Sequence, residues 1–416
     1  MDMQREKVII VGCQLPTVDD WTYEQSMGEL VELVDTAKGE VVARLDQKRQ
    51  QVDRRTFIGK GKIEELAMLV EQFEPDIVIF NAELSPAQSK NIRISLNDPE
   101  EMKLIDRTQL ILDIFAGRAQ SKEGKLQVEL AQMNYLLPRL IGQGTQLSRL
   151  GGGIGTRGPG ETKLESDRRH IKRRIDEISK QLEGTVAHRD RYRERRKENR
   201  VFQIALVGYT NAGKSTIFNR LTEADTYEQD ELFATLDPLT RELELPRGGK
   251  VLITDTVGFI RDLPTKLVAA FRSTLEEVVG ADLVLHVIDA SNPHYLNQID
   301  TTNAVLSELG ASEVPQLEVY NKKDRLTEDF LGGPLLISAI DPSDIETLIG
   351  AVEDKICDVL TRVHVVLPVS SFEHYHPAKE AMYRLEEKFL DDGSVELVGY
   401  MREDTRLYAT LKQFEV

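Results

Sequence analysis

The feature that most constrains this chain is the octapeptide Gly208–Ser215, which reads GYTNAGKS. It matches the pattern G-x-x-x-x-G-K-[ST], in which glycines let the backbone curl so that several N–H groups point toward bound phosphates. An apolar run at 202–207 precedes the motif, and a helical pattern at 216–221 follows it. A strand, a glycine-rich loop and a helix N-terminus in this order predict a phosphate-binding loop in an α/β fold.

Three loops further along the chain also follow apolar runs and carry side chains suited to a nucleotide. Asp255 can hold Mg²⁺ through water, and the N–H of Gly258 can reach a γ-phosphate. Asp324, in the sequence NKKD, can accept hydrogen bonds from the N1–H and exocyclic amine of guanine, whereas adenine has the opposite polarity there. Ser338–Ile340 can complete the base pocket through backbone contacts. The residues predicted to bind GTP or GDP are Gly208, Tyr209, Thr210, Asn211, Ala212, Gly213, Lys214, Ser215, Phe233, Ala234, Thr235, Leu236, Asp237, Asp255, Thr256, Val257, Gly258, Asn321, Lys322, Lys323, Asp324, Ser338, Ala339 and Ile340.

The interval 233–241, FATLDPLTR, lies where a GTPase carries its first switch segment. A threonine there closes over Mg²⁺ only when the γ-phosphate is present. We predict that this threonine is Thr235; Thr240 is the alternative, and a plain turn before Pro238 is a second one. Ser215 and Thr235 are therefore the predicted Mg²⁺ ligands, while Lys214 reaches the β- and γ-phosphate oxygens.

The catalytic group is not identified by the sequence. Gly258 is followed by Phe259, at the position where signalling GTPases carry the glutamine that orients the attacking water. A phenylalanine cannot do this by hydrogen bonding, so either intrinsic hydrolysis is slow or a partner or ion supplies the missing group. Asn211 is a candidate K⁺ ligand; alternatively, it only stabilises the turn of the loop.

Alternating strand and helix patterns in the first 120 residues predict βαβ units around a parallel sheet. Two heptad patterns, 126–140 and 164–182, flank a glycine-rich stretch and predict an antiparallel helical hairpin. Pro138 is expected to end or kink the first of these helices near Leu137. The predicted fold is thus an α/β N-terminal domain with a helical hairpin, a P-loop GTPase domain with a mostly parallel sheet, and a small α+β domain. The predicted boundaries are 1–122, 123–200, 201–361 and 362–416.

Within the third part, continuous apolar runs predict strands buried on both faces. The last part is expected to read strand, helix, strand, strand. The strands predicted in the third part are 202–207, 251–254, 283–288, 316–320 and 335–337, and the elements predicted in the last part are 363–369, 379–390, 395–400 and 405–411.

Charge is unevenly distributed along the 416 residues, whose formal net charge is −17. Residues 139–200 hold 17 Lys and Arg against 9 Asp and Glu, so this arm carries +8 and the rest of the chain −25. A basic arm on an acidic body fits a local nucleic-acid contact. The alternative is a solvated helix held by pairs of opposite charge one turn apart.

Other features exclude whole classes of protein. No apolar run approaches the ~18–20 residues that cross a bilayer, and the first residues do not form a signal peptide. Cys13 and Cys357 are the only cysteines, which excludes a disulfide framework and a cysteine-based zinc site. A cytoplasmic protein without a membrane span is expected.

Several motifs together resemble the HflX family of ribosome-associated GTPases. The most specific is GGGIGTRGPGETKLE at Gly151–Glu165, upstream of GYTNAGKS. The family's FATLDPTTR occurs here with Leu239 in place of a threonine, and DTVGFI occurs at 255–260. SMGEL at 26–30 and TFIGKGK at 56–62 also look like family motifs. The resemblance covers essentially the whole chain.

The resemblance implies a GTPase that docks on the large ribosomal subunit and its rRNA and splits 70S ribosomes, notably stalled or stressed ones. A monomer is expected, because the basic arm needs a free surface. The family's N-terminal domain has been associated with ATP, but no second P-loop occurs here. The alternatives are a regulatory GTPase switch acting through a protein partner and an RNA-remodelling NTPase; Asn321 and Asp324 disfavour an ATP-dependent one. The glycine-rich stretch 151–160 is either an RNA-contacting tip or a flexible linker. The candidate rRNA contacts are Arg157, Lys163, Arg168, Arg169, Arg173 and Arg174.

Overall fold

The computed structural model describes residues 5–97, 102–141, 165, 168–184, 201–222, 232–261, 277–326, 330 and 332–416. The chain divides into two compact units, which are described separately below. The first comprises Met1–Ala187, Glu231–Phe233 and Arg261–Phe271, and the second comprises His188–Asp230, Ala234–Ile260 and Arg272–Val416. The division of the sequence into four domains stays a prediction.

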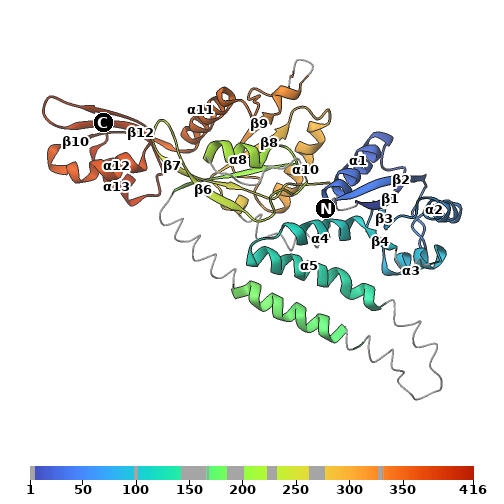
Figure 1. Ribbon diagram of the computed structural model, residues 1–416. Coiled ribbons are helices and arrows are strands. Elements are labelled where there is room, and N and C mark those ends of the chain that lie inside the picture. The colour runs from blue at the N-terminus through green and yellow to red at the C-terminus, as the bar shows by residue number, and fades with distance from the viewer. Residues whose placement is uncertain are drawn as a thin grey trace. The chain divides into compact units, whose positions relative to one another are not determined.

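The first unit is built on a parallel four-stranded sheet in the order β2-β1-β3-β4. Its core joins the inner faces of these strands to helices, with Ile9, Phe80 and Leu66 fully buried. Strand–helix alternation therefore produces the βαβ layering that was predicted (Figure 1). The elements are β1 (Glu6–Gln14), α1 (Asp20–Thr36), β2 (Gly39–Lys48), α2 (Lys60–Phe73), β3 (Ile77–Phe80), α3 (Pro86–Ser95), β4 (Lys103–Asp106) and α4 (Arg107–Arg118).

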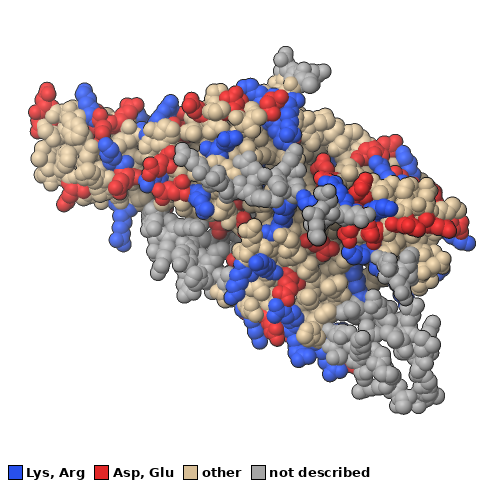
Figure 2. All heavy atoms as spheres, viewed as in Figure 1, with Lys and Arg blue, Asp and Glu red and all other residues tan. Residues whose placement is uncertain are grey.

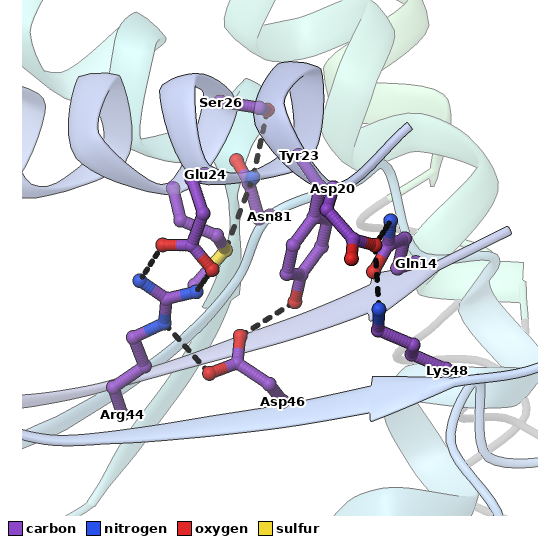
Figure 3. A network of polar contacts seen from close by, with 10 residues as sticks. Gln14, Asp20, Tyr23, Glu24, Ser26, Arg44, Asp46, Lys48 and Asn81 are labelled. Carbon is purple, nitrogen blue, oxygen red and sulfur yellow. Dashed lines mark hydrogen bonds and ion pairs between the residues drawn. The ribbon is translucent and has the colours of Figure 1, made fainter. Parts of the chain in front are cut away.

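A network of polar contacts fastens α1 to the edge strand β2 (Figure 3). Arg44 donates two hydrogen bonds of 2.7 Å to Glu24 and a third, also of 2.7 Å, to Asp46. Asp46 in turn accepts a 2.6 Å hydrogen bond from the Tyr23 hydroxyl, and burial is the main reason that the pKa of Tyr23 is raised. These bonds hold α1 against β2, in addition to the packing of the apolar face of the helix.

The SMGEL motif has a structural role in this unit. Arg107 is only 5% exposed and needs acceptors. It donates to Asn81 Oδ1 at 2.9 Å and forms an ion pair with Glu29 of the motif at 2.5 Å. Asn81 also donates to the Ser26 hydroxyl at 2.9 Å. The motif thus supplies the polar partners that a buried arginine at the start of α4 requires.

The helical hairpin is present as predicted, although its first helix does not stop at Pro138. Helix α5 (Lys122–Ile141) continues through the proline, and the helix at 168–184 lies beside it (Figure 1). Arg174 forms two hydrogen bonds, of 2.6 and 2.8 Å, with Glu129 of α5. The expected stop is wrong: the proline removes one backbone hydrogen bond, and the helix continues for three more residues. Arg139 holds the last turn by donating to the Tyr135 carbonyl at 3.0 Å.

The second unit contains a five-stranded sheet in the order β6-β7-β5-β8-β9, in which only the edge strand β6 is antiparallel. The mostly parallel sheet is confirmed. The predicted strand 335–337 is reduced to a single bridge between Tyr320 and Leu336. The elements are β5 (Phe202–Gly208), α8 (Lys214–Thr222), β6 (Leu239–Glu244), β7 (Lys250–Asp255), β8 (Leu283–Asp289), α10 (Tyr295–Glu308), β9 (Gln316–Asn321), η2 (Lys323–Arg325) and α11 (Pro342–Val359).

The same unit ends in an antiparallel three-stranded sheet, β10-β12-β11, covered by short helices. The α+β class is confirmed, but two elements were predicted wrongly. Most of 379–390 is strand β11, because pairing with β12 outweighs its helical pattern. The segment 405–411 is helix α13, capped by Thr405, whose hydroxyl accepts from the Tyr408 N–H at 2.9 Å. The elements are β10 (Thr361–Leu367), η3 (Val369–His374), α12 (Tyr375–Ala381), β11 (Tyr383–Phe389), β12 (Val395–Met401), α13 (Arg406–Leu411) and η4 (Lys412–Phe414).

Two further expectations concern the whole chain. Within the residues described, no helix is long and apolar enough to cross a membrane. Cys13 and Cys357 are both free thiols, and burial raises the pKa of each.

Candidate active site

The predicted loops gather at one edge of the five-stranded sheet, where the carboxyl ends of its parallel strands meet. Gly208 ends β5 with a φ of 150°, and a Cβ added to it would lie 2.1 Å from the Val287 carbonyl oxygen. Gly213 has a φ of 96°, and its added Cβ would lie 2.1 Å from Asn321 Nδ2. Only glycine fits either position, so the loop must curl tightly against β8 and the base-binding segment.

Lys214 lies inside this loop and is 6% exposed. Its ammonium group donates to the carbonyl oxygens of Tyr209 at 2.8 Å and Gly208 at 3.1 Å. Burial lowers the pKa of Lys214 to about 8, although Asp255 opposes the change. A buried cation on neutral carbonyls is incompletely compensated, and an anion brought to the loop would restore the charged form.

Nucleotide binding is therefore expected to take up a proton above pH 8. Phosphates next to Lys214 raise its pKa back above that of the free protein. The association constant for GDP should stay flat from pH 7 to 8 and then fall by up to about tenfold per pH unit. Titrations with a fluorescent GDP analogue between pH 7 and 9.5 measure this. An association constant that rises with pH in that range would contradict the assignment.

Three oxygen-bearing side chains meet beside the lysine. Ser215 Oγ donates to Asp255 Oδ2 at 2.7 Å, and Thr235 Oγ1 donates to the same oxygen at 2.8 Å. The two hydroxyl oxygens are 2.8 Å apart. Burial raises the pKa of Asp255, and its Oδ1 has no hydrogen-bond partner among the described residues. Hard oxygen donors around an unsatisfied carboxylate oxygen form a set that suits Mg²⁺.

The two threonine candidates for the switch make different contacts in the structure. Thr235 joins the oxygen cluster, whereas Thr240 lies on β6 and its hydroxyl is 2.9 Å from that of Thr254 on β7. Thr240 therefore serves the β6–β7 pairing. The interval contains a strand that the sequence interpretation missed, and only its first part belongs to the site.

The segments predicted to recognise the base are tied to the loop and to each other. Asn321 donates to the Ala212 carbonyl at 2.9 Å and accepts from the Ala339 N–H at 3.0 Å. Ser338 donates to Asp324 Oδ1 at 2.5 Å. The Asp324 carboxylate is thereby held near the loop 338–340, as a guanine-binding site requires.

Two carboxylates beside these loops were not predicted from the sequence. Asp289, at the end of β8, pairs with Lys322 at 2.8 Å. Asp344, in the first turn of α11, accepts from the Ser338 N–H at 2.8 Å and pairs with Lys323 at 3.0 Å. Asp289 follows an apolar run just as Asp255 does, so the same signal was available for it. No local pattern marks Asp344.

Other predicted residues take positions that limit what they can do. Phe259 is 3% exposed, and its backbone bonds to the phosphate-binding loop in both directions, at 2.8 and 3.1 Å. Asn211 is exposed with a φ of 61°, a conformation that asparagine tolerates. Phe233 is buried edge-to-face against Phe115, with ring centres 4.6 Å apart. Thr256 is buried and donates to the Leu206 carbonyl at 2.6 Å. Ile340 is 62% exposed.

The chain is similar in sequence to known GTPases. Residues 203–322 match the family model described as 50S ribosome-binding GTPase, 24–116 match GTP-binding GTPase N-terminal, and 118–196 match GTP-binding GTPase Middle Region. A "GTPase HflX" of Alkalihalophilus pseudofirmus is 51% identical over 413 residues, covering 98% of this chain and 96% of that protein. The "GTPase HflX" of Escherichia coli is 47% identical, covering 74% and 72%. A crystal structure titled "crystal structure of SsGBP and GDP complex" is similar at 26% identity and a TM-score of 0.49, covering 85% of this chain and 98% of that one.

A phosphate-binding loop, an oxygen cluster at its lysine and an NKKD segment beside it define a P-loop GTPase, and this chain is an enzyme of that class. Within this class, the family follows from the sequence identity to relatives over nearly the full length of the chain. The chain belongs to the HflX family of GTPases.

Proposed function

We propose that this GTPase docks on the large ribosomal subunit and splits 70S ribosomes, in the cytoplasm, as a rescue factor for stalled or stressed ribosomes. The description of the family model for 203–322, 50S ribosome-binding GTPase, supports the ribosome as partner. A monomer is the simplest form that leaves a basic arm free for rRNA.

The observation that carries this proposal is a row of exposed arginines on the second hairpin helix. Arg168, Arg169 and Arg173 are exposed. Arg174 instead forms an ion pair with Glu129, which links the two helices of the hairpin. Arg169 lies 3.7 Å from Glu165, and both side chains stay exposed. Exposed cations on one helix of an acidic protein suit a dense array of phosphates. Arg157 and Lys163, the other candidates, lie outside the described residues.

We assign the nucleotide to the four loops as predicted. Lys214 and the loop N–H groups hold the phosphates, while Asp324 and Asn321 secure the base. Ser215 and Thr235 would hold Mg²⁺, which supplies charge neutralisation at the phosphates. Asn211 would hold K⁺; its exposed position within the loop is compatible with this.

The proposal also accounts for Phe259. Its buried side chain leaves the site without a glutamine to orient water. GTP hydrolysis is then slow in the free protein and faster when the large subunit completes the site. The triphosphate favours docking and subunit separation, and hydrolysis releases the factor.

Light scattering of purified 70S particles tests the proposal. Adding the protein with GTP or a non-hydrolysable analogue should lower the signal, whereas GDP should not. Hydrolysis should rise when large subunits are added. If ribosomes change neither hydrolysis nor scattering, the proposed function is wrong and a regulatory switch acting on a protein partner becomes the better hypothesis.

Charge variants of the hairpin sharpen the test. Replacing Arg168, Arg169 and Arg173 by Gln should weaken subunit binding and reduce the slope of log K against log salt by about one for each lost phosphate contact. Arg174→Gln is the matched control: it should loosen the hairpin but leave the salt slope nearly unchanged, because Glu129 already neutralises this arginine. Filter binding at 50–300 mM salt, about the range where such slopes are resolved, measures both.

A further inference from the structure

The C-terminal domain exposes a group of apolar side chains that the nucleotide site does not use. Val369, Phe372 and Phe389 are 62%, 36% and 59% exposed. They come from η3 and from the end of β11, which are separate in sequence. A single exposed apolar residue is ordinary, but a contiguous group marks a contact surface.

These side chains form one surface, which we call the aromatic patch: Val369, Phe372, Phe389 and, beneath them, Tyr375. Phe372 stacks on Tyr375 with ring centres 4.9 Å apart and lies 6.5 Å from the ring of Phe389. Tyr375 and Phe389 are 6.0 Å apart. Val369 lies beside the β11–β12 turn, since a Cβ added to Gly393 would be 3.1 Å from its Cγ2. The patch is thus continuous from η3 to that turn.

The patch is rigidly supported. The Tyr375 hydroxyl donates to Glu387 at 2.7 Å, and Lys379 donates to the same carboxylate at 2.9 Å. The core of the domain, with Val365, Leu397 and Leu411 fully buried, lies beneath. Rings held in place lose little conformational freedom when a partner covers them, which favours binding.

The surroundings of the patch are acidic. Residues 369–393 contain six carboxylates and three cations, and two of these cations are occupied: Lys379 by Glu387, and Arg384 by Asp354 at 2.8 Å. The Glu373 side chain is 79% exposed. In Figure 2 the left end of the molecule, over this domain, is largely tan, with both red and blue groups at its margins. Such a field repels polyanions and a second copy of this acidic chain alike, and attracts cations.

We propose that the aromatic patch docks a basic polypeptide segment of a partner protein. Aliphatic or aromatic side chains of the segment cover Val369 and Phe389, and its arginines stack on the exposed rings or pair with the rim carboxylates. The patch therefore suits a cationic protein segment, whereas the arginine-rich hairpin helix suits an anionic partner. It does not depend on the proposed ribosomal function, because its test contains no ribosomes.

The test uses the full chain and a fluorescent synthetic helix-forming peptide of leucine and arginine, followed by anisotropy at 150 mM salt. The double variant Val369→Ser/Phe389→Ser changes the two most exposed members of the patch and should bind at least tenfold more weakly. The matched control is Leu296→Ser, at a side chain of α10 that is 62% exposed. It should bind like the wild type. Unchanged GDP binding by the double variant confirms that it is folded.

A second pair of measurements separates the patch from general acidity. Glu373→Gln should weaken peptide binding about threefold and lower its salt dependence. A leucine–glutamate peptide and a single-stranded RNA should not compete. The proposal is overturned if the wild type does not bind the basic peptide, if the double variant binds as tightly as Leu296→Ser, or if RNA competes at the patch.

Discussion

Replacing Asp324 by Asn is expected to lower the affinity for GTP and GDP by at least about 100-fold. In the proposed site the carboxylate would accept from the two donors on the guanine edge, and an amide would direct its own N–H group at one of them. The Ser338 hydroxyl, 2.5 Å from Asp324 Oδ1, can still donate to the amide oxygen, so the loop should keep its position. Fluorescent-nucleotide titration measures the loss.

The same variant makes a positive prediction. Xanthine carries a carbonyl where guanine carries its amine, so the Asn amide should bind xanthosine diphosphate better than the wild type does. Asp341→Asn is the matched control. Its carboxylate caps α11 by accepting from the Ser343 N–H, and asparagine caps helices as well as aspartate does. If the Asp324 variant bound GDP like the wild type, the base would not be read here and an ATP-dependent enzyme would have to be reconsidered.

Replacing Thr235 by Ala should slow GTP hydrolysis about 100-fold. Thr235 lies with Ser215 around Asp255 and is the residue proposed to close over the metal only in the triphosphate state. GDP affinity should change by less than about twofold, because the diphosphate state makes no use of this contact. Single-turnover hydrolysis and GDP titration, performed on the same preparation, separate the two effects.

Two further substitutions identify the threonine that matters. Thr235→Ser keeps the hydroxyl and should recover most of the hydrolysis. Thr240→Ala removes the contact to Thr254 between β6 and β7 and should leave the hydrolysis rate within about twofold of the wild type. If hydrolysis slowed more in the Thr240 variant than in the Thr235 variant, Thr240 and not Thr235 would be the switch threonine.

The proposed nucleotide-binding residues could be named from the sequence because the chemistry is local. Phosphate binding requires glycines, a lysine and a hydroxyl within eight residues, and base recognition requires an aspartate after a buried strand. Buried parallel strands are themselves marked by continuous apolar runs. The sheet edge then brings Gly208, Asp255 and Asn321 together, as the fold class demands.

The failures lie where tertiary contacts outweigh local preference. The segment 379–390 has helical spacing, yet β11 forms there because residues 383 and 386–389 pair antiparallel with β12. Helix α5 passes Pro138 because Arg139 binds the carbonyl of Tyr135 and, at 3.0 Å, the carboxylate of Asp106. Asp344 joins the base-binding loops from a helix that local sequence does not connect with them.

The class of chemistry can be read from the amino-acid order alone, since motifs of this kind specify backbone curvature, charge and hydrogen-bond polarity within a few residues of one another. Which of the candidate side chains are available depends on the folded chain. It assigned Arg174 to Glu129, placed Thr235 rather than Thr240 beside Asp255, and left Phe389 exposed among carboxylates. The physical reason is that pairing and burial depend on partners far away in the chain, which a local pattern does not contain.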